Sequence, residues 1–175
     1  MNYKKPLMMK YKFILLAIVA LFICGKSSIN AQTPTERGKF EVSIYENFLH
    51  GTYDLMSYTG ANFGYYFTDN LKVSLDYAGG KSLVGKYNKA QLASLQFGVC
   101  SPVKNRFSLY AGLGPGLLRD LQADEKYKNK AVGVLNVQPR INVGNKSFLA
   151  FDFKAVLGKD LKQASLVGVS WGVRF

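Results

Sequence analysis

His50 is the only histidine of the chain and the first residue to consider for chemistry. Thr52, Asp54 and Ser57 follow it closely, and a hydroxyl nucleophile with a histidine base can cleave ester and amide bonds. Such a group would suit a lipid-modifying enzyme that faces a membrane. Closeness along a loop does not align a nucleophile with a base, and an exposed loop histidine accounts for His50 more simply. We therefore predict no enzyme activity, with lipid A modification as an alternative.

The residue pattern gives no support for a metal or cofactor site. His50 and Cys100 are single residues far apart in the chain, so they lack the ligand spacing of a zinc site. No acidic loop has the pattern of a calcium site, and no glycine-rich loop stands before a helix to hold phosphate. We expect no cofactor, and we expect Cys100 to be a small residue at a strand end.

Charged residues of both signs are the second group with a chemical role to consider. They lie in the middle of predicted strands, on the polar face: Lys72, Asp76, Arg106, Arg140, Asp152, Lys154 and Arg174. If that face lines a narrow lumen, opposite charges could pair across it, because an enclosed charge needs a partner. Such pairs would fill a small lumen rather than open it, and a narrow channel remains an alternative.

Eight segments that alternate between apolar and polar residues must position these charges. In the first, Val42 and Ile44 are opposed by Glu41 and Ser43, which is the period of a strand. The eight apolar rows begin at Phe40, Ala61, Leu71, Ala93, Phe107, Leu135, Leu149 and Val167. Pro139 fits the pattern worst because it removes a ladder hydrogen bond, so we expect a bulge or a strand end there.

The connections between these segments alternate in length. Tight turns are predicted at Thr68–Asn70, Ser101–Asn105 and Gly144–Lys146, and longer loops at His50–Ser57, Gly79–Lys86, Arg119–Lys130 and Gly158–Gln163. In an up-and-down meander all the longer loops lie at one end. Outer-membrane barrels have short periplasmic turns and longer outer loops, so we expect both chain ends at the periplasmic rim.

Alternation alone does not say which face is inside, and a soluble lipocalin-like barrel is the main alternative. The polar face carries small residues such as Gly64 and Gly112, which suit the narrow interior of an eight-stranded barrel. The apolar face carries large residues and almost no charge, as expected of a lipid-facing surface. Aromatic residues near strand ends could form interfacial girdles: Tyr45, Tyr58, Tyr65, Tyr77, Tyr87 and Trp171. We predict an all-β, eight-stranded antiparallel transmembrane barrel.

The first 31 residues have the order of a secretory signal peptide. Four lysines precede the apolar stretch Phe13–Cys24, and a polar segment then leads to Ala31, where we place the cleavage. A lipoprotein signal at Cys24 is an alternative, although Ile23 is large for that role. We predict a signal peptide at 1–31, a short segment at 32–38 and the barrel at 39–175.

The charge of the chain does not indicate a nucleic-acid partner. The formal net charge is +12, but five of the 23 basic residues lie in the predicted signal peptide. The remainder contains no run of five or more like charges and no basic stripe. After residue 31 no apolar run approaches the roughly 18 residues of a membrane helix.

Three stretches resemble the small outer-membrane β-barrel domains of OmpA- and OmpX-like architecture. They are Gly60–Leu71, Leu109–Gly116 and Val169–Phe175. The resemblance implies a location in the outer membrane of a Gram-negative bacterium, contact with lipids and lipopolysaccharide, and insertion by the barrel-assembly machinery. It also implies that Trp171, Val173 and Phe175 form the C-terminal assembly signal. We expect a structural, adhesive or interaction role through the outer loops, with the surface partner unknown.

Overall fold

The computed structural model describes residues 37–50, 55–83, 89–101, 106–121, 127–143, 146–158 and 164–175. The predicted signal peptide lies outside these ranges. The elements are β1 (Phe40–His50), β2 (Leu55–Tyr66), β3 (Leu71–Ser82), β4 (Lys89–Cys100), β5 (Phe107–Leu121), β6 (Tyr127–Val143), β7 (Ser147–Leu157) and β8 (Ala164–Arg174). No helix in this part of the chain is long and apolar enough to cross a membrane.

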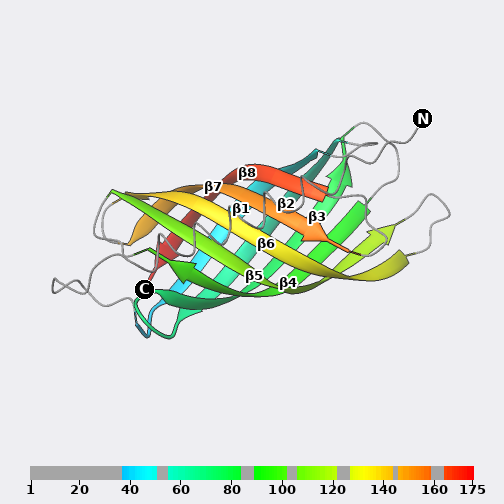
Figure 1. The fold of residues 1–175 in the computed structure, drawn as a ribbon. Helices are drawn as coiled ribbons and strands as arrows, with labels where there is room; N and C mark the ends of the chain where they lie inside the picture. The colour runs from blue at the N-terminus through cyan, green and yellow to red at the C-terminus, as the bar shows by residue number, and fades with distance from the viewer. Residues whose placement is uncertain are drawn as a thin grey trace, which may run out of the picture.

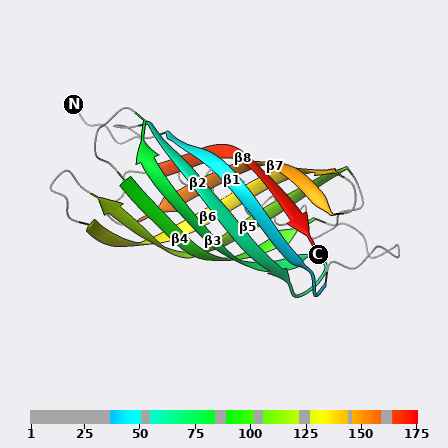
Figure 2. The same cartoon turned by 180° about the vertical axis from the view of Figure 1, so that it is seen from behind.

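The strands form a closed barrel in which each pairs with its neighbours in sequence and β1 pairs with β8 (Figure 1). All pairings are antiparallel, and Figure 2 shows β1 between β8 and β2. Two hydrogen bonds complete the closure, from Phe40 N to Phe175 O at 2.9 Å and from Phe175 N to Phe40 O at 3.0 Å. The prediction of an eight-stranded up-and-down barrel is confirmed.

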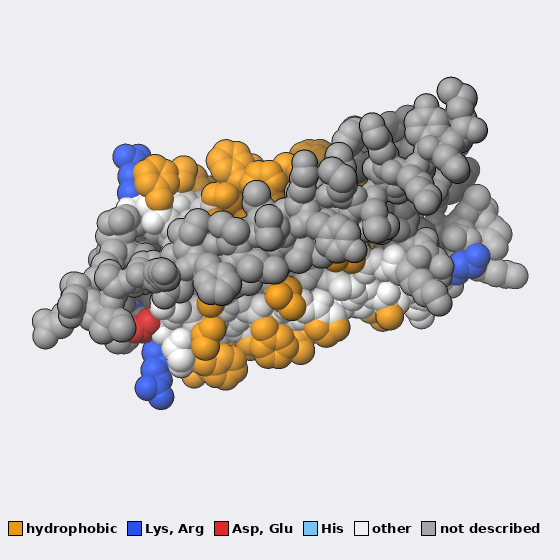
Figure 3. Space-filling view, in the orientation of Figure 1, with side chains coloured by type: hydrophobic (Ala, Val, Ile, Leu, Met, Phe, Trp, Pro, Cys, Tyr) orange, Lys and Arg blue, Asp and Glu red, His pale blue; other side chains and the backbone are white. Residues whose placement is uncertain are grey.

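The large apolar side chains point outward, as the sequence predicts. Ile44 and Leu75 are 57% and 61% exposed, whereas their strand neighbours Ser43 and Asp76 are buried. Hydrophobic side chains lie along the flank of the barrel, and Lys and Arg side chains lie towards its two ends (Figure 3). A lipocalin-like barrel would have the opposite arrangement, because its apolar rows must face inward.

The prediction for Pro139 is wrong, since β6 passes through it without a bulge or an end. Pro139 pairs with Leu109 of β5, and the β6–β7 register is the same before and after it, at Val137↔Phe153 and Arg140↔Ala150. A bulge would have shifted that register by one residue. The strand keeps its β5 ladder, so a local loss of pairing towards β7 is enough to accommodate the proline.

The predicted contrast between tight turns and long loops is weaker in the structure. The strands extend into the segments that the sequence assigns to loops, so β5 reaches Leu121 and β6 begins at Tyr127. Residues 101–106 at one end then form a connection as long as residues 83–88 at the other. The orientation of the barrel in the membrane therefore remains a prediction.

Two of the tyrosines predicted for the aromatic girdles are on the wrong face. Tyr45 and Tyr58 are buried and point into the barrel, where Tyr45 shares a face with Glu41. Tyr77 and Trp171 are exposed on the outer face, and Tyr65 is partly exposed there. Tyr87 lies outside the described residues. Proximity to a strand end is thus a poor guide to the face that a tyrosine occupies, and the alternation of neighbours is a better one.

Candidate functional site

The interior of the barrel next to the chain termini contains one carboxylate that is shared by three cations. Arg140 binds Glu41 with two nitrogens, Nη1 at 2.9 Å from Oε2 and Nη2 at 3.1 Å from Oε1. Lys72 Nζ lies 2.6 Å from Oε1, and Arg174 Nε lies 3.3 Å from Oε2. All four side chains are buried. We call Glu41, Lys72, Arg140 and Arg174 the terminal ionic cluster.

Aromatic rings offset part of the positive excess of this cluster. Lys72 Nζ lies 4.2 Å from the ring centre of Tyr110, and the guanidinium carbons of Arg140 and Arg174 lie 4.4 and 4.8 Å from that of Phe148. A cation over a ring face is stabilised by the ring quadrupole, more so away from water. Within the described part of the barrel, Arg140 Nε and Arg174 Nη2 have no hydrogen-bond acceptor. The terminal ionic cluster thus contains three cations and a single carboxylate, Glu41.

A second cluster, deeper in the barrel, has more carboxylates than cations. Lys154 Nζ lies 2.9 Å from Asp76 Oδ2, 3.4 Å from Asp152 Oδ2 and 3.4 Å from the ring centre of Tyr45. The Tyr45 hydroxyl donates a hydrogen bond of 2.6 Å to Asp76, and the Asn47 side-chain amide donates one of 3.2 Å to Asp152. We call Asp76, Asp152 and Lys154 the central ionic cluster. Its carboxylates are satisfied mainly by neutral donors.

Gln138 connects the two clusters. Its Oε1 accepts a hydrogen bond of 2.6 Å from Arg140, and its Nε2 donates to Asp152 Oδ1 at 3.3 Å. Beside it, Asn136 donates to Gln96 at 3.4 Å, and Gln96 donates to Ser94 at 2.9 Å. Gln138 thus links the two ionic clusters into one network, and Asn136, Gln96 and Ser94 form a separate chain of hydrogen bonds. Such pairing limits the cost of enclosing charge.

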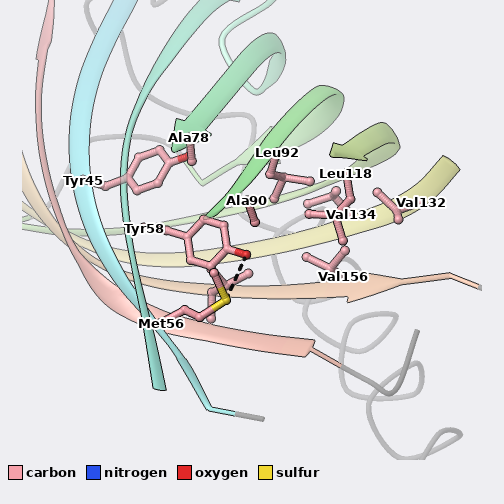
Figure 4. Close-up of a cluster of buried hydrophobic side chains, with 11 residues drawn as sticks. Tyr45, Met56, Tyr58, Ala78, Ala90, Leu92, Leu118, Val132, Val134 and Val156 are labelled. Atoms are coloured by element: carbon pink, nitrogen blue, oxygen red, sulfur yellow. Dashed lines mark hydrogen bonds between the residues drawn. The ribbon is translucent and has the colours of Figure 1, made fainter. Parts of the chain in front are cut away.

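The interior at the opposite end is apolar. The buried side chains there are Tyr45, Met56, Tyr58, Ala78, Ala90, Leu92, Leu118, Val132, Val134, Val156 and Leu166, which we call the apolar plug (Figure 4). They are strand residues that lie close to the connections at this end. Met56, for example, is at the start of β2 and Val156 at the end of β7. Tyr45 belongs both to the plug and to the hydrogen bonding of Asp76. Ionic clusters and plug therefore form one continuous filling of the lumen.

Seven charged residues were predicted to pair across the lumen, and the structure places six of them in the two ionic clusters. Arg106 is the exception, because it is exposed at the rim where β5 begins. Sequence reasoning missed Glu41 as a network member, although it had placed this residue on the polar face. It missed the apolar plug altogether.

The other nominated residues are placed as follows. Trp171 and Phe175 are exposed, and Val173 between them is partly buried. Their role as an assembly signal remains a prediction. The side chains of His50, Thr52 and Asp54 lie outside the described ones, and the Ser57 hydroxyl donates to Glu46 on the outer surface. Among the described residues, no group of three or more His, Cys, Asp or Glu could hold a metal ion.

Comparison with known proteins finds similarity of structure alone. No protein-family model matches the sequence, and no curated protein matches it. The N-terminal β-barrel domain of Pseudomonas aeruginosa OprF is similar with a TM-score of 0.67 and 15% identity, over 79% of this chain and 98% of that one. Ail, the attachment invasion locus protein of Yersinia pestis, gives 0.58 and 15%, over 79% and 99%. Neisserial surface protein A gives 0.57 and 14%, over 81% and 98%. The chain has the fold of these small outer-membrane barrels.

Proposed function

We propose that this chain is an integral outer-membrane protein that acts through its surface, in a structural, adhesive or interaction role, and not through its lumen. Its fold is that of small outer-membrane barrels, and its outer face is apolar where such a barrel meets lipid. Export by the N-terminal signal peptide and insertion by the barrel-assembly machinery belong to this proposal.

The observation that carries the proposal is the continuous filling of the lumen. The bidentate Glu41–Arg140 contact closes the interior near the termini, and the apolar plug closes it at the other end. Ions would have to displace buried, paired charges and then cross a layer of packed apolar side chains, and both steps are costly. A closed barrel of this kind serves as a support for the segments that connect its strands.

Those segments, 51–54, 83–88, 122–126 and 158–163, join strands at the end away from the chain termini. One structural neighbour, Ail, is named for attachment and invasion, and it has been solved in complex with the heparin analogue sucrose octasulfate. By analogy, we propose that the connecting segments of this chain meet a surface partner or the lipopolysaccharide around the barrel.

The test uses the full chain, expressed with its own N-terminal segment and then purified. We expect recovery in the outer-membrane fraction, heat-modifiable migration in gels and no conductance in planar bilayers. A stable ion conductance of the folded protein would contradict the closed lumen, and soluble periplasmic protein would contradict the membrane location. Replacing His50 by Ala should leave the lipid A profile unchanged, and a changed profile would instead support the lipid-modifying alternative.

A further inference from the structure

The outer surface of the barrel carries a polar hollow of about 410 Å³ on β2, β3 and β4, near the end away from the termini. Its lining includes Ser57, Thr59, Gly79, Lys81, Lys89 and Gln91. Lys81 and Lys89 are exposed and stand opposite each other in the β3–β4 register. No atom lies within 4 Å of the position that a Cβ of Gly79 would occupy, so the hollow has free space above this glycine.

Among the side chains that the structure describes around this hollow, cations outnumber carboxylates. Arg119 of β5 is exposed and pairs in register with Gln91, which adds a third cation beside the two lysines. The neighbouring carboxylate, Glu46, lies on the β1 side and accepts hydrogen bonds from Ser57 and, at 2.5 Å, from Thr59. These hydroxyls, together with the attraction of Lys81, hold Glu46 on the β1–β2 side. Among the described side chains, the β3–β5 side of the hollow then presents cations without a carboxylate, which suits a multivalent anion.

An apolar groove of about 640 Å³ lies directly below the polar hollow. Two residues further along the same strands, Thr59, Gly79 and Gln91 give way to Ala61, Tyr77 and Ala93, which line the groove with Phe63, Leu75 and Leu95. The small side chains of Ala61 and Ala93 form the recess, and larger ones border it. Hollow and groove together form one site with a cationic upper part and an apolar lower part.

We infer that this site binds a phosphorylated glycolipid of the lipid A type, with a phosphate against Lys81, Lys89 and Arg119 and an acyl chain in the groove below. A soluble anion would leave the groove empty, and an uncharged lipid would gain nothing from the positive charge of the hollow. Basic pockets beside an apolar membrane surface bind lipid head groups in this way. The choice of the outer-leaflet lipid rests on the proposed function and on the predicted orientation, with the termini at the periplasmic rim.

The test measures binding of bis-phosphorylated lipid A to the full chain, folded in detergent micelles, beside the same lipid after removal of its phosphates. The variant K81Q/K89Q/R119Q should bind lipid A far more weakly, by about fivefold for each cation removed. The matched control R37Q/R106Q/K146Q removes three exposed cations at the opposite rim and should bind like the wild type. Equal affinities of both triple variants, or equal affinity for the dephosphorylated lipid, would overturn the inference.

The groove is tested separately with Ala93→Phe, which should fill it. We expect weaker binding of lipid A and unchanged binding of sucrose octasulfate, a polyanion without acyl chains. If sucrose octasulfate binds the wild type as tightly as lipid A and displaces it fully, the site takes a soluble polyanion and the lipid assignment is wrong. Heat-modifiability is measured on every sample, so that failure to form a membrane barrel, which would contradict the proposed function, is distinguished from failure to bind lipid A.

Discussion

The two ends of the lumen are filled by the same inward positions of the same strands but by opposite chemistry. Near the termini the inward side chains are charged and converge on Glu41, whereas at the other end they are apolar and pack as the plug. Tyr45 belongs to the plug and donates a hydrogen bond to Asp76 of the central ionic cluster, which lies between the two ends. An enclosed volume can therefore be filled either by ion pairs with cation–ring contacts or by close apolar packing.

The two modes of closure should respond differently to substitution. A charge left without its partner in a buried cluster costs more than the contact itself was worth, because the remaining ions stay desolvated. A truncated apolar side chain costs its transfer free energy plus the cavity that it leaves. The stability of the barrel in lipid vesicles, measured by urea titration of the folded gel band, gives a common scale for both ends.

The largest effect is expected for Glu41→Gln. This change leaves Lys72, Arg140 and Arg174 without the one carboxylate of their cluster, and we expect a loss of about 3–5 kcal/mol in the free energy of unfolding. Removing a cation as well, in E41Q/R140Q, should restore part of that loss. If the double variant is less stable than E41Q by the full cost of a second deletion, the charges are not coupled in the way that the distances indicate.

A smaller effect is expected at the apolar end for Leu92→Ala. Leu92 is 2% exposed within the plug, and its truncation should cost about 3 kcal/mol because the barrel wall cannot collapse into the space. Leu95→Ala is the matched control, since Leu95 is on the same strand, faces outward and is 38% exposed. Lipid can fill the space that the truncated side chain leaves on the outer face, so the control should lose clearly less stability. Equal losses would mean that the plug is not tightly packed.

Within the central ionic cluster, the two aspartates should differ. Asp76 lies 2.9 Å from Lys154 and Asp152 lies 3.4 Å from it, so Asp152→Asn leaves the shorter contact in place. We expect Asp152→Asn to cost about 1.5 kcal/mol, at the lower end for hydrogen bonds to charged groups, and Asp76→Asn to cost more. The reverse order in the same urea titration would show that Lys154 depends mainly on Asp152.

The alternation of residue types was enough to predict the strands, the closed barrel and its outward apolar face. It also placed Glu41 on the inner face, because the side-chain period of a strand is two. It could not show that Glu41 meets Lys72, Arg140 and Arg174, since these residues come from four strands. Which inward residues share a level depends on the tilt and stagger of the strands, and a single sequence does not encode these directly.

The apolar plug escaped prediction for a different reason. Near the loop ends, inward residues such as Met56 and Leu118 are apolar, whereas their outward neighbours Ser57 and Arg119 are polar. The alternation is therefore reversed with respect to the middle of the strands, and this change made the predicted loops too long. A strand whose apolar residues move from the outward to the inward face along its length does not keep one period-two pattern by which to be recognised.

The smallest effect is expected at Arg106, which was predicted to line the lumen but lies outside the network. Arg106 directly precedes β5, and Arg140 lies in the neighbouring β6 near the same rim. Arg106 is exposed, whereas Arg140 is 1% exposed and bidentate to Glu41. Arg106→Gln should leave the urea midpoint within experimental error, because an exposed charge keeps its hydration in either state. Arg140→Gln should lower the midpoint strongly, since a neutral amide cannot replace both guanidinium contacts. Similar shifts for the two variants would mean that net charge near the termini, and not pairing inside the lumen, stabilises this end of the barrel.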